Sequence, residues 1–328
     1  MKASYFVTVL LLSDITLTSG FIIESIVCGS AAAVAAFLYA LSHWDNVLPF
    51  DHKRLEKDLN ENLHGQHIVS KVVLRTVSSF MTDSNPNKPL VLSFHGTAGV
   101  GKNHVSKIIA RNIYKLGDKS EHFIMFVSQH HFPHKDKVDM YSARLKEQIH
   151  QHVSRFPRTM FVFDEMDKMN PRLVETIKPF LDYGTHVDGA SFRSAIFIFL
   201  SNAGGDVINN IALDFWKAGK NREELQMKEM ETQILQNIVN DKSTGGFWHS
   251  SLINHHLVDH IVPFLPLEMK HVRQCVLTEM VNLNINLQHH AHLADTVARD
   301  MPFFPSDKIF SVKGCKSVRQ KLMLYVDD

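Results

Sequence analysis

The sequence predicts an α/β fold: a parallel five-stranded sheet flanked by helices, followed by a small C-terminal helical lid domain. Five short apolar runs have the length of buried strands, at residues 90–94, 123–127, 160–163, 196–200 and 261–264. Segments with helical periodicity separate these runs, and such alternation favours a parallel sheet covered on both faces. From Pro266 onward the periodicity is helical and no strong strand is present, which indicates the separate helical region.

Helices are expected in the sequence both before and after the first strand. Residues 51–63 and 68–81 have helical patterns, and Gly65 can cap the first of them. Two prolines in residues 85–89 exclude a helix from the turn before the first strand. After that strand, residues 104–114 place their apolar side chains on one face, which would pack back on the sheet.

The composition is that of a globular protein without a strong electrostatic bias. Of 328 residues, 45% are hydrophobic and 21% are charged, with 35 Lys and Arg against 34 Asp and Glu. A net charge of +1 gives no electrostatic basis for binding nucleic acid. The 21 His residues lack the paired Cys or the His-Glu-x-x-His context of a zinc site, so we expect no metal bound by His.

A glycine-rich turn follows the first predicted strand and precedes a predicted helix, which is the order of a phosphate-binding loop (P-loop). The turn consists of Gly96, Thr97, Ala98, Gly99, Val100, Gly101, Lys102 and Asn103. Its glycines let the backbone direct N–H groups at a phosphate chain, Lys102 adds a charge at the β- and γ-phosphates, and the helix adds its positive N-terminus. Asn103 replaces the usual hydroxyl at Mg²⁺. Its amide oxygen can coordinate the ion or hold a ligating water, so we expect altered rather than absent metal binding.

Two carboxylates, Asp164 and Glu165, end the third predicted strand. We expect Asp164 to hold Mg²⁺ through water and Glu165 to polarise the attacking water. Each motif alone gives false positives. Both motifs together, in this order, indicate a protein that hydrolyses ATP or GTP.

Asn202 and Lys316 are the remaining candidate nucleotide contacts. Asn202 follows the fourth predicted strand, and the carboxyl ends of parallel strands gather ligand groups, so it could orient the attacking water near the acidic pair. Alone, it would be read as a strand-end Asn in a turn. Lys316 opens a helical stretch near the C-terminus and can reach the β- and γ-phosphates, although an isolated exposed Lys is usually only solvated.

The first 45 residues predict membrane association. Residues 1–20 have the basic start, short apolar run and small residues of a secretory signal peptide. Residues 21–45 contain a second apolar stretch with no charge between Glu24 and Asp45, which is just short of a spanning helix. A single span, a helix or hairpin in one leaflet, and a buried core helix are all compatible with it. Its moderate hydrophobicity favours partial insertion.

The motifs in this order resemble the AAA+ ATPases, within them the Clp-type proteins, and most closely the torsin family. The similarity extends over nearly all of residues 55–328. Beyond the P-loop, the matching runs are residues 163–169, 177–183, 199–204, 212–216, 246–252, 262–268 and 314–316. The family usually carries an Asn-x-Ser/Thr sequon, and this sequence has none.

The resemblance implies an ATP-binding and ATP-hydrolysing chaperone-like protein of the endoplasmic reticulum and nuclear envelope lumen, with ATP and Mg²⁺ as cofactors. It implies a homo- or hetero-oligomer and peripheral membrane contact through residues 21–45. The expected domains are a signal peptide (1–20), the hydrophobic segment (21–45), an AAA+ nucleotide-binding domain (46–267) and the lid (268–328).

The sequence also lacks a residue that most AAA+ ATPases use. Their arginine finger, supplied to a neighbouring subunit, stands just before the fifth strand, at about Leu257 in this sequence. No Lys or Arg occurs between Lys242 and Lys270. Because such a finger contributes roughly 10³–10⁵ in rate, the chain alone should be a weak ATPase. The resemblance implies that a membrane-anchored cofactor of the lamina-associated polypeptide 1 type supplies the arginine.

The alternative function is a nucleotide-switched binding or scaffold protein, in which hydrolysis only resets partner docking. It is supported by the missing finger and by the lack of a substrate-threading loop. Between Lys102 and Asp164 the only glycine is Gly117, and no aromatic-Val-Gly triplet occurs.

The three cysteines, Cys28, Cys275 and Cys315, cannot form a disulfide framework, but one pair and one free thiol are possible. The resemblance implies a redox-sensitive pair of Cys275 and Cys315. Because Cys315 adjoins Lys316, a disulfide between them would shift that lysine and change nucleotide affinity. Two buried small hydrophobic side chains are the alternative.

Overall fold

The computed structural model describes residues 47–183, 186–240 and 257–326. The predicted signal peptide (1–20) and the predicted hydrophobic segment (21–45) therefore both lie outside the described residues. No helix within the described ranges is long and apolar enough to cross a membrane. The described residues from Pro49 onward form one compact unit.

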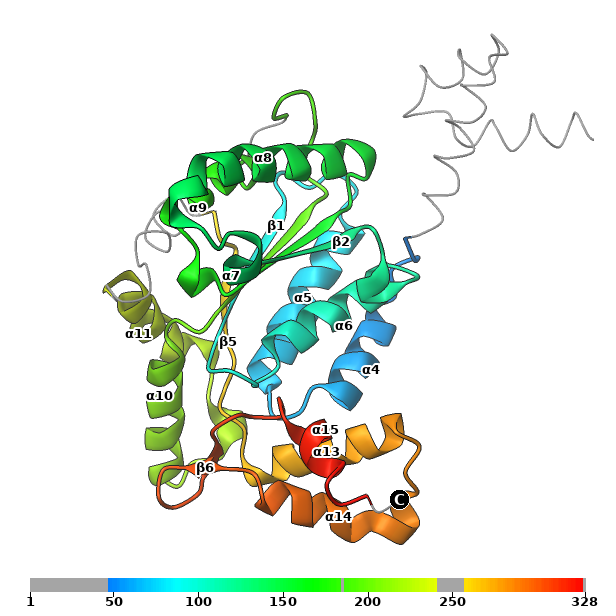
Figure 1. Cartoon of the computed structure of the whole chain (residues 1–328), viewed down its shortest axis with the longest axis vertical. Helices are drawn as coiled ribbons and strands as arrows, with labels where there is room; N and C mark the ends of the chain where they lie inside the picture. Colours follow the sequence, from blue (N-terminus) through cyan, green and yellow to red (C-terminus); the bar gives the residue numbers. More distant parts are fainter. Residues whose placement is uncertain (1–46, 184–185, 241–256, 327–328) are drawn as a thin grey trace, which may run out of the picture. The chain divides into compact units, whose positions relative to one another are not determined.

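Five parallel strands form the central sheet of this unit, as the sequence predicts (Figure 1). They are β1 (Leu90–His95), β2 (Phe123–Val127), β3 (Met160–Asp164), β4 (Ile196–Ser201) and β5 (His260–Pro263). The strand order is β2-β3-β4-β1-β5, and every neighbouring pair is parallel. This order places β4 between β1 and β3, so the P-loop, the acidic pair and Asn202 follow three adjacent strands.

Helices cover both faces of the sheet, with α8 and α9 on one face and α4, α5 and α6 on the other (Figure 1). Before β5, the described ranges contain the helices α4 (His52–Asn62), α5 (His67–Thr82), α6 (Lys102–Ile113), α7 (Ser128–His131), α8 (Val138–Arg155), α9 (Pro171–Ile177), α10 (Gly205–Lys217) and α11 (Met227–Asn240). Short 3₁₀ helices are η1 (Gly117–Lys119), η2 (Lys135–Lys137), η3 (Met166–Lys168), η4 (Lys178–Phe180) and η5 (Arg222–Glu224).

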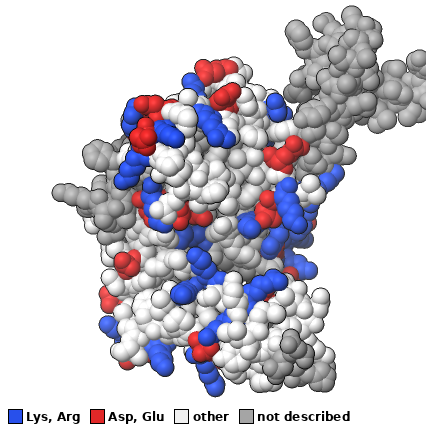
Figure 2. All heavy atoms as spheres, in the orientation of Figure 1, with Lys and Arg blue, Asp and Glu red and all other residues white. Residues whose placement is uncertain are grey.

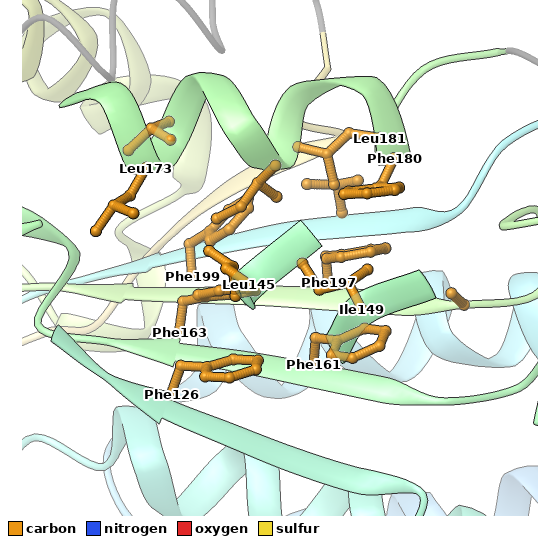
Figure 3. Close-up of a cluster of buried hydrophobic side chains, with 14 of the residues drawn as sticks. Phe126, Leu145, Ile149, Phe161, Phe163, Leu173, Phe180, Leu181, Phe197 and Phe199 are labelled. Carbon is orange, nitrogen blue, oxygen red and sulfur yellow. The ribbon is translucent and has the colours of Figure 1, made fainter. Parts of the chain in front are cut away.

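A cluster of phenylalanines packs α8 and α9 against the sheet (Figure 3). Phe163 of β3 lies 5.1 Å from Phe126 of β2 and 5.6 Å from Phe199 of β4, measured between ring centroids. Phe161 stacks on Phe197 at 5.1 Å. Because these rings sit side by side across β2, β3 and β4, their packing supports the register that aligns the carboxyl ends of the strands.

The C-terminal region has its own hydrophobic cluster and is helical, as predicted. It comprises α13 (Met269–Asn282), α14 (Leu287–Arg299) and α15 (Val318–Leu322). The sequence did not predict the antiparallel pair of β6 (Phe303–Phe304) and β7 (Phe310–Ser311) in this region. Strands of two residues are too short to produce an alternating pattern. The domain boundaries remain predictions.

The surface of the unit carries charges of both signs. Lys and Arg side chains are interspersed with Asp and Glu over the face seen in Figure 2. The described residues on that face therefore do not form a continuous basic stripe.

Candidate functional site

The P-loop connects β1 to α6 and holds the ammonium group of Lys102 inside the fold. Lys102 Nζ donates hydrogen bonds to Gly96 O (2.5 Å), to Thr97 O (2.9 Å) and to Asn202 Oδ1 (3.0 Å). Burial lowers the pKa of Lys102 to about 8, against the opposing effect of the Asp164 and Asp167 carboxylates. The site therefore contains a desolvated cation whose charge is compensated by neighbouring oxygens.

The acidic pair stands at the end of β3, beside the P-loop. Asp164 Oδ1 accepts a hydrogen bond from the backbone N–H of Glu165 (2.8 Å), and burial raises the pKa of Asp164. Glu165 has a left-handed backbone with φ of 56°, which is uncommon for a residue other than glycine. Such conformations concentrate at functional sites, where surrounding structure enforces them.

Asn202 is held on the other side of Lys102. Its amide oxygen accepts the hydrogen bond from Lys102, and its backbone N–H donates to Asp167 Oδ1 over 3.0 Å. Asp167 could not be singled out from the sequence, because one carboxylate in an acidic loop looks like a solvated side chain until β3 and β4 are placed together. Asp167 acts through Asn202 and is a positioning residue.

His95 is a second residue that sequence reasoning missed. It is fully buried at the end of β1, where its Nδ1 donates to Ala203 O (3.0 Å) and its Nε2 lies 2.7 Å from Ser93 Oγ. Burial lowers the pKa of His95 to about 4, so its ring is neutral at physiological pH. His95 fixes the segment that follows Asn202, and a lone His in an apolar strand carries no sequence signal for that role.

A loop of the lid lies directly on the P-loop. The backbone N–H of Cys315 donates to Gly99 O over 3.0 Å. Gly99 has φ of +83°, and a Cβ placed on it would lie 1.8 Å from Lys313 O. A Cβ on Gly314 would lie 2.2 Å from Gly99 O. Only glycine at both positions permits this backbone approach.

Cys275 of α13 and Cys315 of this loop form a disulfide in the structure, with their Cα atoms 6.1 Å apart. The sequence left open whether these two cysteines form a disulfide or are two buried small hydrophobic side chains, and the structure contains the disulfide. The bond ties the loop that touches Gly99 to the first lid helix.

Most of the predicted site residues line one cavity of about 630 Å³. They are Ala98, Gly99, Val100, Gly101, Lys102, Asn103, Asp164, Glu165, Asn202, Cys275, Cys315 and Lys316. Gly96 and Thr97 do not line it, but their carbonyls hold Lys102. Two other cavities, of about 820 and 720 Å³, are larger and contain none of these residues, so size does not identify the site.

The far wall of the cavity joins the turn after α4 to the lid. His64 Nε2 lies 2.9 Å from Thr278 Oγ1 of α13, and both residues line the cavity. Gln66 donates to Val100 O (2.9 Å) and to Leu265 O (2.8 Å), which links this turn to the P-loop. The sequence predicted a helix cap here and missed these contacts, because they connect segments far apart in the chain.

The site's oxygen atoms fit a Mg²⁺–nucleotide. Asn103 Oδ1 is buried and has no hydrogen-bond partner among the described residues. An amide oxygen and the carboxylate of Asp164 are ligands that Mg²⁺ accepts, and the ion usually takes few protein ligands besides water and phosphate. The described ranges contain no group of three or more His, Cys, Asp or Glu suited to a metal, and a site of this kind does not need one.

Substituting Gly99 with Ala should separate the lid loop from the P-loop. Gly189 has nearly the same backbone, with φ of +86°, but no atom within 4 Å of its Cβ position, so Gly189→Ala is a matched control. Both variants should lose about 1 kcal/mol of stability from backbone strain. Only Gly99→Ala should also lose about tenfold in affinity for a fluorescent ATP analogue. Equal affinities in titrations of the two variants would contradict the predicted role of this contact.

Comparisons with known proteins address the family and the fold. The family model described as Torsin matches residues 37–163, and the model described as Torsin-1A, C-terminal domain, matches residues 267–325. Among solved structures, the Hsp104–ADP complex of S. cerevisiae is similar, with a TM-score of 0.59 and 17% identity over 83% of this chain and 46% of that chain. A closed-state Hsp104 structure with ATPγS and FITC-casein has a TM-score of 0.59 and 16% identity, over 84% and 46%.

This chain spans about half the length of the Hsp104 chains that it matches. At such low identity, the likeness to Hsp104 shows the fold alone. The two family models together match more than half of the sequence. The chain therefore belongs to the torsin family of AAA+ ATPases.

Proposed function

We propose that this protein hydrolyses ATP in the lumen of the endoplasmic reticulum and nuclear envelope, where it remodels protein complexes as a chaperone. We propose further that it needs an arginine from a membrane-anchored cofactor of the lamina-associated polypeptide 1 type. The proposal rests on one observation: Lys102, Asp164 and Asn202 lie together at the carboxyl ends of adjacent strands. The contact of Lys102 with Asn202 joins two of these groups directly.

Lys102 would bind the β- and γ-phosphates together with the N–H groups of the P-loop. The three hydrogens of its ammonium group all have partners, namely two loop carbonyls and Asn202. A phosphate oxygen would take over one of these hydrogen bonds, since a charge-assisted bond is stronger than one to a neutral carbonyl. Lys316 would add a second cation from the lid.

Asn103 and Asp164 would hold Mg²⁺, which when bound supplies charge stabilisation at the phosphates. Glu165 would orient the attacking water and accept its proton. Asn202 would fix that water from the neighbouring strand, while Asp167 and His95 keep the Asn202 segment in place.

The need for an external arginine is supported by the surroundings of Leu257. Its side chain is 4% exposed, and its carbonyl accepts a hydrogen bond from Lys88 Nζ over 3.2 Å. Lys88 also pairs with Asp259 at 2.7 Å, and its side chain is 9% exposed. This cation beside the finger position is therefore held by its own chain.

A second candidate function, a nucleotide-switched binding protein, is supported by a specific observation. The sequence lacks both the finger and the threading loop, and binding alone could order the lid through Gly99 and Cys315. Single-turnover hydrolysis with and without the cofactor domain separates the two functions. The alternative is favoured if partner docking and function follow ATP binding and do not require its turnover.

Substituting Glu165 with Gln should leave ATP binding intact and stop hydrolysis. The variant retains Lys102 and Asp164 but loses the proton acceptor, so ATP-bound partner complexes should accumulate. The measurements are binding of a fluorescent ATP analogue and co-purification from detergent-solubilised membranes. Lys102→Ala, which removes the phosphate contact, is the comparison. If Glu165→Gln loses ATP binding as completely as Lys102→Ala does, the role of Glu165 is structural.

The proposed location predicts that the whole mature chain is shielded in microsomes. The N-terminal apolar segments and the known location of the torsin family support this expectation. Protease added outside intact microsomes should not cleave the protein, which should resist salt washing and be released by detergent. Cleavage at residues after Asp45 in sealed microsomes would contradict the luminal location.

The cofactor proposal predicts slow hydrolysis by the chain from about residue 46 onward. Adding the luminal domain of the cofactor should raise steady-state phosphate release by about 10³–10⁵-fold, because its guanidinium stabilises charge on the transferred phosphoryl group. Changing that arginine to Ala in the cofactor should abolish the stimulation but not the binding. Rapid hydrolysis by the chain alone would mean that another cation already serves the site.

A further inference from the structure

We infer that Lys168 is a positioning residue that restrains the Glu165 carboxylate and thereby slows hydrolysis by the isolated chain. The inference rests on the proposed function, since it takes Glu165 as the proton acceptor. The inference concerns the role of Lys168, and the experiment that tests it can contradict that role without contradicting the proposed function.

Lys168 holds Glu165 by a direct ion pair. Lys168 Nζ lies 2.9 Å from Glu165 Oε1, and it also donates to Gln129 Oε1 over 3.0 Å. Gln129 belongs to α7, which begins directly after β2, and β2 is paired with β3. The ammonium group thus connects the carboxylate to the end of the neighbouring strand.

The local backbone enforces this pair. Glu165 precedes η3, and the N–H of Lys168 donates to Glu165 O over 2.9 Å, which closes the 3₁₀ turn. In a 3₁₀ helix the side chains of residues i and i+3 eclipse each other. The left-handed conformation of Glu165 and the turn after it therefore place the two side chains together.

The ion pair holds the Glu165 carboxylate on the Lys168 ammonium group. The hydrogen bond that Lys168 donates to Glu165 is the main cause that raises the pKa of Lys168, so Lys168 is fully cationic. To face a water at the phosphate, the Glu165 side chain has to leave this partner.

The restraint is modest because both groups reach solvent. The Lys168 side chain is 40% exposed and that of Glu165 is 27% exposed. Ion pairs of this exposure shift an equilibrium by about two- to fivefold. A restraint of that size slows the reaction without blocking it, and a docked partner can remove it.

The test is single-turnover hydrolysis of radiolabelled ATP by the full chain in detergent. Lys168→Met should raise the rate constant by about two- to fivefold at unchanged ATP affinity. Lys168→Arg keeps the positive charge and should therefore hydrolyse ATP as slowly as the unsubstituted protein. Gln129→Leu, which removes the tether without altering η3, should change the rate in the same direction. Lys178→Met is the matched control. Lys178 pairs with Glu175 at the same distance of 2.9 Å and the same i, i+3 spacing, outside the site, so its loss should not change the rate.

A double substitution separates the possible failures. In the Glu165→Gln background, Lys168→Met should have no further effect, because the group that it releases is absent. Hydrolysis that persists in Glu165→Gln would overturn the proposed role of Glu165 and the restraint with it. An inactive Glu165→Gln combined with an unchanged or slower Lys168→Met would overturn the restraint alone. Acceleration by Lys178→Met as large as that by Lys168→Met would also overturn it, since the effect would not be specific to the site.

Discussion

The buried ammonium group of Lys102 is the interaction on which the rest of the site depends. Removing a charge from water is costly unless oxygens surround it. Here the compensating oxygens come from three chain segments: two P-loop carbonyls, Asn202 after β4, and the carboxylates that follow β3. Satisfying this one cation therefore requires the carboxyl ends of β1, β3 and β4 to lie together. The phenylalanines that pack β2, β3 and β4 in register provide that alignment.

The lid contacts the P-loop through backbone atoms and not through side chains. Gly99 and Gly314 approach so closely that neither could carry a Cβ, and Cys315 donates its N–H to Gly99. The disulfide from Cys315 to Cys275 extends this contact to α13. A displacement of α13 is thus transmitted to the phosphate-binding backbone through one covalent bond and one hydrogen bond. Lys316, next to Cys315, moves with the same loop.

The sequence was sufficient for those parts of the fold and site that leave a local pattern. Strands buried on both faces appear as uninterrupted apolar runs, and all five were found within two residues of their ends. The P-loop and the acidic pair have fixed spacing around such strands, so their residues could be named in advance. The contacts of Asp167 with Asn202, of His95 with Ala203 and of Lys168 with Gln129 could not, because each depends on which strands are neighbours. The pairing of β6 with β7 was missed for the separate reason that two residues show no periodicity.

The charges around the cavity explain why such a site would depend on a partner. Three cations line it, Lys102, Lys316 and Arg319, and three carboxylates do as well, Asp164, Glu165 and Glu279. Arg319 is paired with Glu279 at 3.0 Å. Outside the lining, Lys168 pairs with Glu165, and Asp167 adds a fourth carboxylate whose charge acts on Lys102. The described residues thus provide no excess positive charge for a triphosphate. In phosphoryl transfer, where catalysis is mainly positioning and charge stabilisation, such a deficit lowers the rate. On the proposed function, Mg²⁺ would offset part of the deficit and the arginine of the cofactor would supply the rest, which would make that partner part of the catalytic site.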